Sequence, residues 1–126
     1  MKKKIIRSLS APAAIGPYSQ AVEINGMLFI SGSLGINPET GKLVEGGVAA
    51  QTEQLLRNIG EILREAGYDF SDVVKTTCFL SDMSNFKLMN EVYAGVFIKD
   101  QPARSTIAVK DLPMGALVEI ETIAVK

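Results

Sequence analysis

One arginine and two glutamates are the residues of this chain best suited to chemistry on a small acid. Arg104 lies in the segment Pro102–Thr106, and Glu119 and Glu121 lie in the segment Val118–Glu121, which follows after a turn. A guanidinium can hold a planar carboxylate through two parallel hydrogen bonds, and a glutamate in apolar surroundings can hold or deprotonate a water molecule. We therefore expect these two neighbouring apolar segments to carry the function.

The composition removes most other kinds of catalytic site. The chain has no histidine and one cysteine, which excludes Ser-His-Asp and Cys-His catalysis and nearly every structural zinc site. Any chemistry must therefore use arginine, glutamate, tyrosine, hydroxyl groups and the backbone.

Size and charge are typical of one globular domain that binds neither nucleic acid nor membrane. The 126 residues are 47% hydrophobic, enough for one core, so we predict a single domain over residues 1–126. The net charge of −1 gives no general attraction to phosphate. The start of the chain lacks the apolar stretch of a signal peptide, and no apolar run approaches the ~18 residues of a membrane span. With Cys78 as a lone cysteine inside a predicted strand, we expect a cytoplasmic protein.

The first half of the chain predicts a hairpin followed by a helix. Two β-branched, apolar segments, Ser19–Ile24 and Met27–Ser31, flank Asn25-Gly26, a dipeptide suited to a two-residue hairpin turn. The glycine-rich stretch 32–47 reads as a loop. Apolar residues then recur at helical spacing from Val48 to Ala66, and Gly67 is placed to end the helix.

The second half predicts a strand, a helix and two more strands. The strands are Val73–Leu80, Arg104–Val109 and Leu117–Val125, and the helix runs from Phe86 to Phe97 with Ser84 as its N-cap. The order β-β-α-β-α-β-β predicts an α+β domain, with a mixed sheet and two helices packed on one face.

The last strand indicates that the other face of the sheet is also covered. Apolar residues occur on both of its alternating faces, and the chain has no third layer to cover the second one. Packing of that face against copies of the same chain is the economical solution, so we predict an obligate homo-oligomer.

Five motifs along the chain together resemble the RidA/YjgF family of enamine/imine deaminases. They are Ala11–Gln20, Ser31-Gly32, Asn90–Tyr93, Pro102–Ser105 and Val118–Glu121, so the resemblance runs nearly end to end. It implies a fold similar to a trimeric chorismate mutase, a homotrimer with its sites at subunit interfaces, and no cofactor.

The resemblance also implies an activity and a set of site residues. Family members of the RidA type hydrolyse 2-aminoacrylate and 2-iminobutanoate, reactive products of pyridoxal-phosphate enzymes, to 2-oxo acids and ammonia. By position, Arg104 would bind the substrate carboxylate and Glu119 would position and activate the attacking water. The remaining residues implied for catalysis or substrate binding are Tyr18, which closes the pocket, the backbone of Ser31, Gly32 and Thr106, and Asn90 nearby.

Two positions depart from the family pattern. Thr106 stands where many relatives have cysteine, and threonine can replace it if the backbone carbonyl is the functional group. Ser33-Leu34 replaces the Gln-Ile or Gln-Leu that commonly follows Ser-Gly, so the preferred substrate is left open.

Several residues also have purely structural interpretations. Glu119 could pair with Arg104 or Lys75 to neutralise a buried charge, and Glu121 could be an exposed or ion-paired strand carboxylate. Tyr18 could be a buried anchor, and Asn90 could be a capping or packing amide.

Three other functions are alternatives to hydrolysis. Chorismate mutase chemistry would need more positive groups than one arginine per site to hold a dianion. A non-catalytic trimer that binds small carboxylates would use Arg104 without Glu119. Ribonuclease activity has no support in the charge balance or in a chain without histidine.

Overall fold

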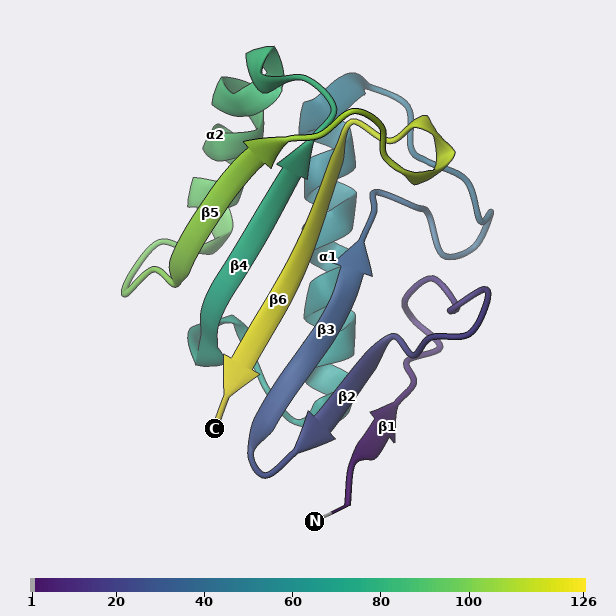
Figure 1. The fold of residues 1–126 in the computed structure, drawn as a ribbon, viewed down its shortest axis with the longest axis vertical. Coiled ribbons are helices and arrows are strands. Elements are labelled where there is room, and N and C mark those ends of the chain that lie inside the picture. The colour runs from purple at the N-terminus through teal and green to yellow at the C-terminus, as the bar shows by residue number, and fades with distance from the viewer. Residues whose placement is uncertain (1) are drawn as a thin grey trace.

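The computed structural model describes residues 2–126, which form a six-stranded sheet with both long helices on one face (Figure 1). The strand order is β1-β2-β3-β6-β4-β5, with β4 and β5 parallel and the other neighbours antiparallel. The elements are β1 (Lys4–Ile6), β2 (Ala21–Ile24), β3 (Met27–Ser33), α1 (Gly47–Ala66), β4 (Val73–Leu80), α2 (Phe86–Val96), β5 (Ala103–Ala108) and β6 (Val118–Val125), with short 3-10 turns at Phe70–Asp72, Met83–Asn85 and Pro113–Gly115. The α+β prediction is confirmed.

The predicted hairpin joins β2 and β3. Asn25 and Gly26 have φ angles of 54° and 77°, the left-handed pair that matches the twist of two antiparallel strands. The backbone N–H of Lys126 donates to the Gly26 carbonyl at 2.8 Å, so the end of β6 is held at this turn.

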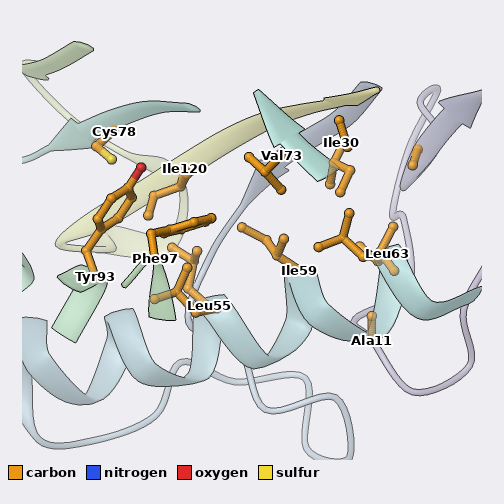
Figure 2. Packing of buried hydrophobic residues seen from close by; sticks show 14 of the residues in the cluster. Ala11, Ile30, Leu55, Ile59, Leu63, Val73, Cys78, Tyr93, Phe97 and Ile120 are labelled. Atoms are coloured by element: carbon orange, nitrogen blue, oxygen red, sulfur yellow. The ribbon is translucent and has the colours of Figure 1, made fainter. Parts of the chain in front are cut away.

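Helix α1 ends where its sequence predicts. Gly67 has φ 82°, and its N–H donates to the carbonyls of Leu63 and Arg64, which satisfies groups that the last turn leaves open. The apolar stripe of α1 packs on the sheet, and Figure 2 shows Leu55, Ile59 and Leu63 pointing toward it. On the sheet side, Leu28 of β3 and Ile120 of β6 are fully buried.

Two details of the predicted elements are wrong. A third N-terminal strand, β1, pairs with β2, so the order is β-β-β-α-β-α-β-β. With three residues, two of them exposed, β1 is too short to show an alternating pattern. Ser84 is not the N-cap of α2: Asn85 holds that position without a side-chain hydrogen bond, and Asp82 accepts the Ser84 N–H at 2.9 Å instead.

No part of residues 2–126 covers the sheet face away from the helices (Figure 1). Phe29, Ile107 and Val125 lie on this open face and are 40%, 46% and 40% exposed. This open face also carries Glu119 and Glu121, because they alternate with the buried residues of β6. Within residues 2–126, no helix has the length and apolar character needed to cross a bilayer.

Candidate active site

The predicted site residues form two groups on opposite faces of the sheet. Arg104 is in register with Thr76 of β4, whose side chain is 1% exposed and faces the helices. Glu119 is paired with Phe79 of β4, on the open face. The two segments are neighbours in the sequence but not in the sheet, because β4 lies between β5 and β6, a separation of about 10 Å. One chain therefore does not bring the arginine and the glutamate together.

The arginine group comprises Arg104 and Thr106 of β5 and Asn90 of α2. Arg104 is exposed on the edge strand β5, and its Nη1 donates to Oδ1 of Asn90 at 2.7 Å. Its guanidinium carbon also lies 4.7 Å from the ring centre of Tyr93 and 5.5 Å from that of Phe86. Asn90 is thus a partner of the arginine rather than a helix cap.

Thr106 lies two residues after Arg104 and faces the same side of β5, in register with Cys78. Its hydroxyl is buried and has no hydrogen-bond partner among residues 2–126. Removing a hydroxyl that makes no hydrogen bond should change the free energy of unfolding little. The fold therefore does not depend on the Thr106 hydroxyl.

The glutamate group begins with Glu119, which is half-buried on the open face. Burial, and next the neighbouring charge of Glu121, raise the pKa of Glu119 above its ordinary value of 4.5. Within residues 2–126 no ion pair joins Glu119 to Arg104 or Lys75. Lys75 instead donates to the Thr76 carbonyl at 3.1 Å and the Thr77 hydroxyl at 3.3 Å. A carboxylate without a cation beside it, and with a raised pKa, is suited to accepting a proton.

Gly32 makes room for that carboxylate. The pairing of β3 with β6 shifts between Ile30 and Ser33, so the strand bulges at Gly32. A Cβ at this position would lie 2.6 Å from Oε2 of Glu119, which is closer than two atoms can approach. Glycine therefore lets the carboxylate lie against the backbone in this position. The bulge is anchored by the Ser31 hydroxyl, which donates to the Ser19 carbonyl at 2.6 Å.

Tyr18 is next to the bulge and is 54% exposed, so its ring is not a buried anchor in this chain. Its hydroxyl accepts the Ile15 N–H at 3.3 Å, and its own N–H donates to the Gly16 carbonyl at 2.9 Å. Tyr18 borders a cavity of about 310 Å³ together with Ser31 and Gly32. Apolar side chains complete much of its wall: Ile15, Leu34, Ile36, Ile62 and Met114.

Two residues near Arg104 were not singled out for function from the sequence. The helical spacing of Phe86 and Tyr93 predicted core positions only. It did not indicate that either ring contacts Arg104 beside Asn90. Because Phe86, Asn90 and Tyr93 are spaced i, i+4 and i+7, they share one face of α2, and that spacing was the available signal. Among residues 2–126, no group of three or more histidine, cysteine, aspartate or glutamate side chains gathers at a metal-binding distance.

Residues 8–126 match the family model described as Endoribonuclease L-PSP. That match covers nearly all of the sequence and includes every residue of both groups. The chain belongs to the RidA/YjgF family. The resemblance inferred from the five motifs is therefore confirmed.

Relatives with functional names cover almost the whole chain. The chain is 53% identical over 124 residues to the chloroplastic Reactive Intermediate Deaminase A of Arabidopsis thaliana, covering 98% of this chain and 66% of that protein. It is 51% identical over 124 residues to the 2-iminobutanoate/2-iminopropanoate deaminase of Mus musculus, covering 98% of this chain and 92% of that protein.

A solved structure of the family has the same fold. The YjgF gene product of E. coli superposes with a TM-score of 0.92 at 42% identity, covering 98% of each chain. The strand order and the positions of the two helices are thus those of the RidA/YjgF fold.

Proposed function

We propose that this protein hydrolyses 2-imino acids and their 2-enamine forms, such as 2-iminobutanoate and 2-aminoacrylate, to 2-oxo acids and ammonia. The observation that carries the proposal is the pair of prepared groups: an exposed, held guanidinium and an uncompensated carboxylate against Gly32. Two relatives that are 51% and 52% identical to this chain are named 2-iminobutanoate/2-iminopropanoate deaminase. Pyridoxal-phosphate enzymes release such compounds, so the role would be removal of damaging metabolites in the cytoplasm.

The chemistry needs few groups because a protonated imine carbon is already electrophilic. Arg104 would hold the substrate carboxylate through a two-point contact. Glu119 would take one proton from water as the water oxygen attacks C2, leaving C2 with a hydroxyl and an amino group. That proton would pass from Glu119 to the nitrogen, the C–N bond would break to release ammonia, and the C2 hydroxyl would return its proton to Glu119 as it becomes the carbonyl. Tyr18, Ser31 and Gly32 would line the pocket, with the backbone of Thr106 beside the arginine.

The separation of the two groups supports a site shared between copies of the chain. A four-carbon acid cannot reach from Arg104 to Glu119 within one chain, because they lie on opposite faces with β4 between them. Arg104 is exposed and Glu119 is half-buried on the open face. Association of copies would bury the apolar residues of that face. We propose a homotrimer in which one chain supplies Arg104 and its neighbour supplies Glu119.

The first test is the activity itself. Threonine dehydratase generates 2-iminobutanoate in the presence of the purified protein, and ammonia or 2-oxobutanoate release is measured against the spontaneous rate. We expect a clear acceleration. A rate equal to the spontaneous one, together with binding of 2-oxobutanoate, would favour a non-catalytic carboxylate-binding protein.

The second test addresses the shared site. The variants Arg104→Ala and Glu119→Gln are each expected to retain at most about 1% of wild-type activity as pure oligomers. If they are unfolded together and refolded at equal amounts, random assembly gives about a quarter of the interfaces one intact arginine and one intact glutamate. We therefore expect about a quarter of wild-type activity. The matched control is a mixture of Arg104→Ala with the double variant, which has no intact interface, and an inactive first mixture would contradict the shared site.

A further inference from the structure

Helix α2 surrounds the guanidinium of Arg104 although the arginine belongs to β5. Phe86, Asn90 and Tyr93 face it from the same side of the helix, with the Asn90 bond at 2.7 Å and the ring centres 5.5 and 4.7 Å away. A cation above an aromatic face is attracted by the ring's electron distribution. The arginine is therefore held from one side by an amide and two rings.

Of these residues, Tyr93 is held most firmly in its own place. Its side chain is 5% exposed, its hydroxyl shares a hydrogen bond of 2.7 Å with the Thr76 hydroxyl, and its ring centre is 4.6 Å from that of Phe97. Figure 2 shows the ring extending from α2 up to the sheet beside Cys78. Thr76 is in turn the β4 residue in register with Arg104. Arg104 is thus linked to Thr76 by strand pairing, Thr76 to Tyr93 by the hydroxyl bond, and Tyr93 back to Arg104 by the ring contact.

These three contacts matter because an arginine on an edge strand is otherwise free to change rotamer. Holding a long side chain in one conformation costs entropy, and a substrate that must do so on binding pays that cost in affinity. Asn90 engages one of the five guanidinium N–H donors, and the rings cover one side. The other donors stay available for a carboxylate.

We infer that Tyr93 is a positioning residue, whose ring fixes the guanidinium of Arg104 in the orientation that receives a 2-imino acid carboxylate. This role rests on the proposed hydrolysis. Tyr93 contacts Arg104 and not the reacting C=N carbon, so its loss should weaken substrate binding without slowing the step assigned to Glu119.

The experiment compares Tyr93→Phe, Tyr93→Leu and Phe70→Leu in the 2-iminobutanoate assay, with kcat and KM measured separately. Tyr93→Leu removes the ring, and we expect KM to rise about tenfold with kcat within about twofold of wild type. Tyr93→Phe keeps the ring and is expected to retain a near wild-type KM. Phe70→Leu is the matched control, because its ring packs on Phe97, with ring centres 5.5 Å apart, and not on Tyr93. Its KM should stay unchanged even where its thermal midpoint falls.

Binding of 2-oxobutanoate, measured by calorimetry, gives an independent readout that should weaken in parallel with KM. If Tyr93→Leu does not fold, Phe86→Leu serves as the second variant, with an expected rise in KM of about threefold. A KM for the ring-deleted variants no higher than that of Phe70→Leu would overturn the role of Tyr93 and leave the hydrolytic function intact. A wild-type protein without activity would overturn the function and this role with it.

Discussion

The arginine group and the glutamate group are prepared for their tasks in opposite ways. Arg104 is exposed but held by contacts, with an amide at 2.7 Å and a tyrosine ring at 4.7 Å. Glu119 is half-buried and lies against the bulge at Gly32, with its pKa raised by burial. Arg104 is oriented by its hydrogen bond and ring contacts. Glu119 is made a better proton acceptor by surroundings that offer its charge no cation.

The difference has a physical basis in the two tasks. Binding a carboxylate benefits from a fixed, fully charged partner. Contacts with a neutral amide and aromatic rings fix the guanidinium without reducing its charge. A base must give up its ionised form readily, so a nearby cation would make Glu119 a poorer proton acceptor. Keeping the two groups on opposite faces of the sheet prevents them from neutralising each other within a chain.

The largest expected effect comes from removing the base. Glu119→Gln keeps the shape of the side chain, and we expect kcat to fall about 10²- to 10⁴-fold while the oligomer stays folded. The measurement is the 2-iminobutanoate assay together with light scattering. Glu121→Gln is the matched control on the same strand face and should stay active. Full activity of Glu119→Gln would instead favour a structural role.

The pH dependence sharpens the same contrast. Because the pKa of Glu119 is raised above 4.5, activity should fall as the pH drops through that raised value, so kcat/KM should show an acid limb above pH 4.5. Charge on Glu121 contributes to the rise, so Glu121→Gln should move the limb to lower pH.

For stability the sign is reversed. A carboxyl whose folded-state pKa is raised favours folding when protonated, and this contribution is lost as the pH rises through the folded value. Glu119→Gln should therefore gain stability relative to wild type at neutral pH, with the gain vanishing below pH 4.5. Thermal midpoints measured across this range check it, and an equal midpoint difference at all pH values would contradict the desolvation of Glu119.

Changing the held arginine should have the next largest effect. Arg104→Lys keeps the charge but loses the planar two-point grip, so we expect kcat/KM to fall on the order of a hundredfold, as for Arg104→Ala. Arg57→Lys on the exposed side of α1 is the control and should be neutral. Near-normal rates in both Arg104 variants would remove this residue from the mechanism.

Local signals in the sequence predicted most of the fold. Asn25-Gly26 and Gly67 predicted the hairpin and the end of α1, because both need left-handed backbone angles that few residues adopt. The strand order was not predictable in the same way, since the insertion of β6 between β3 and β4 depends on packing of the whole sheet. That order separates Arg104 from Glu119, so their relation could not be read from their closeness in the chain.

The candidate site divides along the same line. The residue types at Arg104 and Glu119 pointed to their chemistry, because few other groups in a chain without histidine could serve. The partner of Arg104 could not be found from strand pattern, because it comes from α2 across the β4–β5 crossover. The sequence placed Gly32 at the pocket only through the family motif, and its contact with the Glu119 carboxylate depends on the bulge in β3.

A smaller effect is expected where the backbone meets the base. Gly32→Ala would place a methyl group 2.6 Å from Oε2 of Glu119. Because the flexible end of the glutamate can move, the fold should survive and the carboxylate should be displaced, with a fall in kcat of about tenfold. The control is Gly95→Ala in α2, which meets nothing within 4 Å and should stabilise the helix by about 0.5–1 kcal/mol with activity unchanged. Unchanged kcat for Gly32→Ala would mean that the exact position of Glu119 is not important.

The smallest effect should be that of thiol reagents. It tests whether β4 and β5 separate enough beside Arg104 to admit a reagent to Cys78. Cys78 lies in β4 in register with Thr106, is 0% exposed, and has its pKa raised chiefly by burial, so both access and thiolate formation are suppressed. Excess iodoacetamide should leave the activity of the native protein unchanged, whereas the chain unfolded in guanidinium should react at one thiol. Mass spectrometry and the imine assay report the two results together. Loss of native activity in proportion to alkylation at Cys78 would mean that β4 and β5 open beneath Arg104, and the rigid arginine group would then be the more mobile of the two.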